Sequence, residues 1–69
     1  MKFELGAFVR ATSNELYTFR EGEVGQITGF MLNASGVQVE ISDLEGLGFE
    51  DVIPADQLAH FFEPAENHS

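Results

Sequence analysis

The stretch REGEVGQITGF, residues 20–30, places three glycines in and beside a segment with the composition of a β-strand. Glycine in a strand costs conformational entropy, so its repetition there needs a physical reason. A phosphate-binding loop needs consecutive backbone N–H groups at a helix start and usually a nearby lysine. Here β-formers follow Gly25, and the only lysine is Lys2. We therefore predict that Gly25 and Gly29 bend a long strand against its neighbour, and that Gly22 forms a turn.

Outward from this stretch, alternating apolar residues and regularly spaced turn residues indicate an all-β chain. The first strand directs Val9 and Ala11 to one face, and the third directs Val37, Val39 and Ile41 to one face. Pro54 opens a single 3₁₀ turn over 54–58. The expected strands cover residues 7–12, 23–31, 37–42, 47–53 and 60–63, joined by a polar connection over 13–21 and by turns over 33–36 and 43–46.

Three segments of the chain resemble a known family. The segments LGAFVRAT and FREGEVGQITGF resemble the KOW-type pattern, and FEDVIPADQLAHF resembles the close of the same barrels. The resemblance covers most of residues 5–62 and implies an all-β, five-stranded SH3-like barrel with a short 3₁₀ turn before the last strand. It implies a barrel over 1–63 and a flexible tail over 64–69. The families that share this frame include ribosomal and transcription-factor KOW domains, PsaE-like subunits of photosystem I, related subunits of ferredoxin-linked complexes, and small phage or prophage proteins of unknown role.

The length and composition restrict the class of protein. A chain of 69 residues forms one domain with a thin core. It contains no cysteine, which excludes disulfides and zinc–thiolate sites. The N-terminal residues lack the continuous apolar run of a signal peptide, and no stretch approaches transmembrane length. We expect a cytoplasmic protein that does not associate with membranes.

The charge of the chain is strongly negative. It has 3 basic and 12 acidic residues, with a net charge of −9 at pH 7. Its basic residues are Lys2, Arg10 and Arg20, and every acid except Glu4 and Glu15 follows them. Such a surface repels phosphate backbones and anionic membranes. Two interpretations stay open: the acids serve solubility alone, or they engage a basic partner, including by mimicry of nucleic-acid charge.

The resemblance also implies two alternative functions. KOW domains that bind RNA use basic and aromatic residues, which here leaves an edge formed by Arg10 and Arg20, with Tyr17 and Phe19 available for base stacking. Two arginines on a chain of net charge −9 give little counterion release, which argues against nucleic acid as the partner. A PsaE-like accessory subunit helps to dock ferredoxin, which is acidic, so the charge argues against that role too.

The aromatic residues exceed what so small a core encloses. There are 7 phenylalanines and 1 tyrosine. Phe61 and Phe62, if adjacent on a strand, point to opposite sides, so that one lies outside the core. Either the aromatic residues all pack in the core, or some form an exposed patch for a partner or a second copy.

No catalytic or metal-binding motif is recognisable. His60 and His68 belong to no Ser/His/Asp arrangement, and DLEGLGFED lacks the spacing of a calcium loop. We therefore predict a non-enzymatic, acidic protein-interaction module without metal or cofactor, related to phage or mobile-element proteins, monomeric or weakly dimeric, that engages a basic protein surface. The predicted partner-binding residues are Tyr17, Phe19, Glu40, Asp43, Glu45, Glu50 and Asp51.

Overall fold

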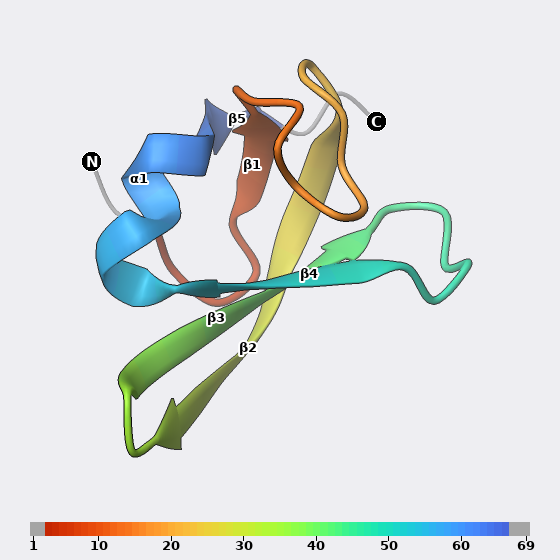
Figure 1. The fold of residues 1–69 in the computed structure, drawn as a ribbon. Coiled ribbons are helices and arrows are strands. Elements are labelled where there is room, and N and C mark those ends of the chain that lie inside the picture. The colour runs from red at the N-terminus through yellow and green to blue at the C-terminus, as the bar shows by residue number, and fades with distance from the viewer. Residues whose placement is uncertain (1–2, 67–69) are drawn as a thin grey trace.

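A computed structural model describes residues 3–66 of the chain. These residues form five strands and one short helical segment between the last two strands (Figure 1). In chain order the elements are β1 (Phe8–Ala11), β2 (Val24–Asn33), β3 (Gly36–Asp43), β4 (Glu50–Pro54), the 3₁₀ turn η1 (Ala55–Gln57), α1 (Leu58–Phe61) and β5 (Phe62–Ala65).

The five strands form one antiparallel sheet in the order β4-β3-β2-β1-β5. The strands β4 and β5 lie at its two edges, and β1 pairs with both β2 and β5. The longest elements, β2 and β3, form a hairpin that projects from the rest of the molecule (Figure 1). The all-β class and the number of strands are therefore as the sequence predicts.

The glycines of residues 20–30 have the structural roles that the sequence predicts. Gly25 is buried, and a Cβ there would lie 2.6 Å from Cζ of Phe19 and 2.8 Å from Cγ2 of Ile41. The register between β2 and β3 shifts between Ile27 and Gly29, which marks a β-bulge. Gly22 has φ +93° in the turn before β2, a conformation that residues with a side chain rarely adopt.

The core lies on the face that the alternation of β1 and β3 predicts. Val9, Ala11, Val39 and Ile41 are each at most 1% exposed. Val37, expected on the same face, is 44% exposed, because it pairs with Leu32 near the end of the projecting hairpin. The side chains of Phe19 and Phe62 meet edge to face, with ring centroids 5.8 Å apart. The buried core comprises Val9, Ala11, Leu16, Phe19, Ile27, Val39, Ile41, Ile53, Leu58 and Phe62.

The last third of the chain departs from the sequence prediction in three places. The fourth strand begins at Glu50, not at residue 47, because Gly46 and Gly48 adopt positive φ and hold residues 44–49 in a loop. The helical turn continues to Phe61, with Leu58 buried, so His60 and Phe61 are helical and not in a strand. The last strand then extends to Ala65, so residues 64 and 65 belong to the sheet; residues 67–69 of the expected tail lie outside the described residues.

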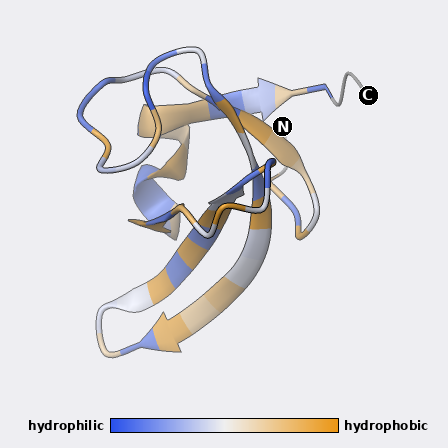
Figure 2. Cartoon of the chain, turned by 90° about the vertical axis from the view of Figure 1, so that its right-hand side faces the viewer, coloured by the Kyte–Doolittle hydropathy of each residue, from blue (hydrophilic) through white to orange (hydrophobic). Residues whose placement is uncertain are grey.

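The aromatic residues divide between the core and the surface. Phe19 and Phe62 are buried, and Phe3 and Phe61 pack partly buried against the core. Three other aromatic side chains are exposed: Tyr17, Phe30 and Phe49. Phe30 belongs to the apolar end of the projecting hairpin, where hydrophobic residues continue along β2 beyond the core (Figure 2). Not all the aromatic residues are needed to fill the core.

Candidate functional site

A buried carboxylate fixes the long connection between β1 and β2. Asp51 on β4 is 4% exposed, and its two oxygens accept the main-chain N–H of Thr18 at 3.1 and 3.2 Å. The N–H of Phe19 donates to the same carboxylate at 3.1 Å. The Thr18 hydroxyl adds a hydrogen bond to the main-chain oxygen of Glu50 at 3.0 Å. These bonds tie the connection to β4 and place Phe19 over the core.

A second carboxylate, Asp43, shapes the loop between β3 and β4. Its oxygens accept the main-chain N–H of Leu47 at 3.0 Å and of Phe49 at 3.2 Å. These donors, Leu47 foremost, hold the pKa of the Asp43 carboxyl below its usual value of 3.8. The main-chain N–H of Asp43 also donates to the carbonyl of Phe49 at 3.0 Å. The loop is thus closed around one side chain, with Leu47 and Phe49 left on its surface, 65% and 57% exposed.

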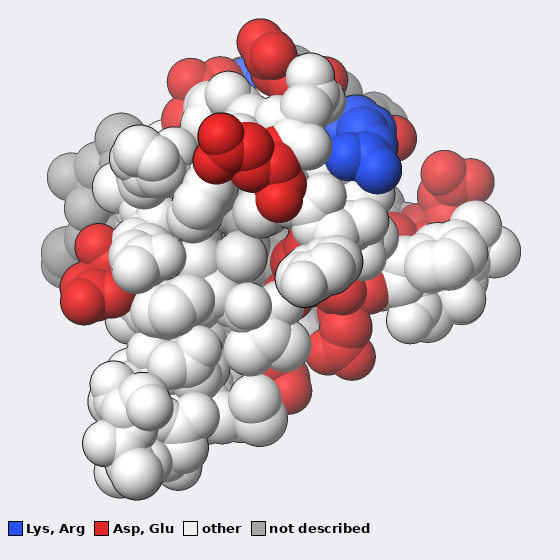
Figure 3. Space-filling view, viewed as in Figure 1, with Lys and Arg blue, Asp and Glu red and all other residues white. Residues whose placement is uncertain are grey.

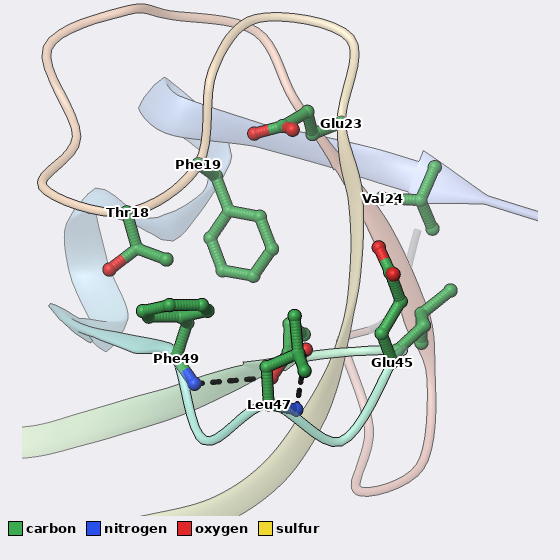
Figure 4. A pocket seen from close by; sticks show the side chains of 9 residues that line it. Thr18, Phe19, Glu23, Val24, Glu45, Leu47 and Phe49 are labelled. Atoms are coloured by element: carbon green, nitrogen blue, oxygen red, sulfur yellow. Dashed lines mark hydrogen bonds between the residues drawn. The ribbon is translucent and has the colours of Figure 1, made fainter.

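An open pocket of about 620 Å³ lies between the connection from β1 to β2 and the loop from β3 to β4. We refer to these two segments as the two loops. Phe19 lies at its inner side, because its ring also contacts the core, and Phe49 lies beside it (Figure 4). In Figure 4 the side chain of Glu45 extends from its loop toward Val24, and Glu23 lies on the opposite loop near Phe19. The lining residues are Thr18, Phe19, Glu23, Val24, Asp43, Leu44, Glu45, Leu47 and Phe49.

The carboxylates around this pocket differ in how many of their oxygens already accept hydrogen bonds within the protein. Both oxygens of Asp43 accept hydrogen bonds inside the loop. One oxygen of Glu23 accepts the main-chain N–H of Arg20 at 2.6 Å, which leaves its other oxygen available. The Glu45 carboxylate has no hydrogen-bond or ion-pair partner within residues 3–66. The rim therefore presents exposed carboxylate oxygens of Glu23 and Glu45 that accept no hydrogen bond from residues 3–66.

The structure separates the seven predicted partner-binding residues. Phe19, Asp43 and Glu45 line the pocket, whereas Tyr17, which precedes the lining residue Thr18 in the chain, is 97% exposed and does not line it. Phe19, only 3% exposed, contributes ring surface to the pocket floor and is no protruding anchor. The register of the sheet puts Glu40 and Glu50 on the outer face of β3 and β4, opposite the core.

The prediction that Asp51 belongs to an exposed, partner-binding acidic stretch is wrong, because its side chain is buried. It pairs with Ile41 and faces inward, and its oxygens bind the connection from β1 to β2. Its neighbour Glu50 points outward instead, as alternation along a strand requires.

The predicted arginine edge is engaged within the protein. Arg10 forms an ion pair with Glu63 at 3.3 Å. The Arg20 guanidinium donates to the main-chain oxygens of Asn14 at 3.1 Å and Leu16 at 3.4 Å. Both arginines thus stabilise local structure, Arg20 by closing its own loop.

Sequence reasoning missed most of the apolar lining: Leu44, Leu47, Phe49 and Val24. Residues 47–49 read as the start of a strand because Leu47 and Phe49 alternate around Gly48. The available signal was Gly46 and Gly48 two residues apart, a spacing typical of a loop that uses positive φ twice.

Acids are spread over the body and the loops, whereas the tip of the projecting hairpin shows no charged side chain on the face seen in Figure 3. Within residues 3–66 no three His, Asp or Glu side chains gather in a group that could hold a metal ion. In the same part of the chain, no helix has the length and apolar character needed to cross a membrane. The chain matches no family model, no curated protein and no solved structure.

Proposed function

We propose that the protein is a non-enzymatic interaction module that engages a basic protein surface through the pocket between its two loops. The observation that carries this proposal is the combination found there: an apolar, aromatic lining with carboxylates of Glu23 and Glu45 at the rim. Such a surface supplies both an anchor for an apolar group and an attractive field for a cation.

We assign the sheet to the SH3-like barrel class, with a KOW-like second strand. The strand order β4-β3-β2-β1-β5, the long connection before a bent β2 and the 3₁₀ turn before β5 support this assignment. In this class a rigid sheet carries loops that vary between proteins, so a site on the loops is consistent with binding.

The charge of the molecule supports a basic partner over a nucleic acid. A net charge of −9 steers cationic surfaces toward the protein and repels phosphates. Both arginines of the alternative RNA edge already bind groups within the chain. Exposed Tyr17 adds an aromatic contact at the edge of the pocket.

A synthetic peptide array tests the proposal with defined probes. We expect the protein to retain peptides that combine Lys or Arg with an apolar residue, and to release them as salt rises. The variant Glu23→Gln with Glu45→Gln should reduce binding about tenfold or more, whereas Glu40→Gln with Glu50→Gln, which removes the same charge from the outer face, should change it less than about threefold.

Two results would reject the proposal. Equal losses in the two double variants would mean that only net charge matters, and no retention of basic peptides would mean that the surface has no such partner. Retention of RNA on a filter at low salt, abolished by Arg10→Gln with Arg20→Gln, would favour the alternative function instead.

A further inference from the structure

We infer that the pocket between the two loops binds one arginine side chain of the partner, with the guanidinium against Phe49 and paired with Glu45. This inference rests on the proposed function and adds the identity of the group that the pocket recognises. It follows from the shape of the pocket, the chemistry of its lining and the exposed carboxylate of Glu45 at its rim.

The lining combines aromatic surface with negative charge. Phe19 and Phe49 supply ring surface, and Leu44, Leu47 and Val24 supply aliphatic surface. An arginine stem is aliphatic and its head is planar and weakly hydrated, so it stacks on rings and covers apolar surface at the same time. A lysine ammonium is more strongly hydrated and loses more when it leaves water.

The carboxylates decide where the charged head binds. Asp43 has both oxygens engaged with loop amides, so it has little capacity for a ligand. Glu45 lines the same pocket, with its side chain extending toward Val24 in Figure 4, and its carboxylate has no partner in the described chain. A guanidinium carries five N–H donors in a fixed fork that matches a carboxylate in two parallel hydrogen bonds. The second oxygen of Glu23 can take a further donor.

A neutral apolar ligand is a worse occupant of the same pocket. It would cover the rings but also displace water from the carboxylate of Glu45 without replacing its hydrogen bonds. The chain's own arginines do not serve either, since Arg20 donates to loop carbonyls and Arg10 pairs with Glu63. The volume of about 620 Å³ is within the range of small-ligand pockets and admits the side chain with its adjoining main chain.

The test is an NMR titration of the ¹⁵N-labelled protein with N-acetyl-L-arginine amide. Matched probes are N-acetyl-L-citrulline amide, which has nearly the same shape but no charge, and N-acetyl-L-lysine amide. We expect saturable shifts at about millimolar arginine probe, as for a single side chain, confined to the amides of residues 17–19 and 44–49. The citrulline probe should bind at least about tenfold more weakly and the lysine probe about threefold more weakly.

Two variants test the named contacts. Glu45→Gln and Phe49→Ala should each weaken arginine binding about three- to tenfold, while Glu40→Gln on the outer face should leave it unchanged. The dispersion of the amide spectrum verifies that each variant is folded. Glu45→Gln changes no hydrogen bond of the described chain, so it also serves where Phe49→Ala disturbs the loop.

Each contrary result overturns a stated part of the inference. Equal affinity for citrulline removes the charge recognition, and equal affinity for lysine removes the selection of arginine. Shifts spread over the acidic surface, or none at all, remove the pocket as the site. If the array still retains basic peptides in a manner that depends on Glu23 and Glu45, the proposed function stands and only the arginine assignment fails.

Discussion

Replacing Asp51 with alanine removes the carboxylate that joins the connection between β1 and β2 to the sheet. In the native protein the main-chain N–H groups of Thr18 and Phe19 both donate to it. The Phe19 bond is buried and the Thr18 bonds are partly buried, and alanine offers no acceptor in their place. We expect a large loss of stability, because the variant leaves two donors without partners in a site that water reaches poorly.

The magnitude follows from the number of donors. Each donor left unsatisfied costs about 1–3 kcal/mol, so the two donors freed in Asp51→Ala should lower the free energy of unfolding by about 2–6 kcal/mol. A domain of 69 residues has roughly 3–10 kcal/mol in all, at about 0.05–0.15 kcal/mol per residue. The loss is therefore a large fraction of the total free energy of unfolding. Asp51→Asn keeps one oxygen and should lose less than Asp51→Ala.

Urea unfolding followed by circular dichroism measures this loss. The matched control is Glu50→Ala, the preceding residue on β4, whose side chain is exposed and whose main-chain oxygen still accepts the Thr18 hydroxyl. The control should change the free energy of unfolding by less than about 0.5 kcal/mol. With a slope near 1 kcal/mol per molar urea, the midpoint of Asp51→Ala should fall by about 2 M or more. Midpoints for the two variants that agree within error would refute the structural role of Asp51.

Three further predictions concern the strand bend, the second loop and the core. Gly25→Ala should cost about 1–3 kcal/mol, because its Cβ meets two buried side chains, whereas Gly29→Ala, which meets only a flexible carboxylate, should cost less; equal thermal midpoints would contradict this. The pKa of Asp43 is lowered by loop amides, so its contribution to stability is present above pH 3.8 and is lost as the pH falls through the lowered value. A ¹³C titration of its carboxyl with a midpoint at or above 3.8 would refute that. Phe62→Ala should cost about 3–5 kcal/mol, since the ring is 1% exposed, and should lower the urea midpoint accordingly; a midpoint equal to that of the native protein would exclude Phe62 from the essential core.

The sheet was predictable because the two-residue period of a strand appears in the sequence as an alternation of apolar and polar residues. Val9 and Ala11, or Val39 and Ile41, alternate with polar residues, and burying one of each pair requires burying the other. The glycines were predictable for a related reason, since a long strand with Gly25 and Gly29 in its interior must approach something closely.

The pocket was not predictable from the same patterns. Residues 44–49 become a loop because the carboxylate of Asp43 binds amides four and six residues ahead, and no local propensity reports that bond. The inward position of Asp51 depends on the register of β4. The sequence Glu50-Asp51 does not indicate which of these two acids faces the core. A shift by one residue would bury Glu50 and expose Asp51, and only the Thr18 and Phe19 amides favour the observed choice.

The acids of this chain therefore divide into two groups with different consequences. Asp51 and Asp43 each bind main-chain amides of one loop, and together they set the two walls of the pocket. Glu45 contributes to no such bond and leaves its charge at the rim. Substituting the first group should abolish binding together with stability, whereas Glu45→Gln should weaken binding at constant unfolding midpoint. If Glu45→Gln were as destabilising as Asp51→Ala, Glu45 would have a structural role like Asp43 and Asp51. The negative charge at the rim would then not indicate a ligand.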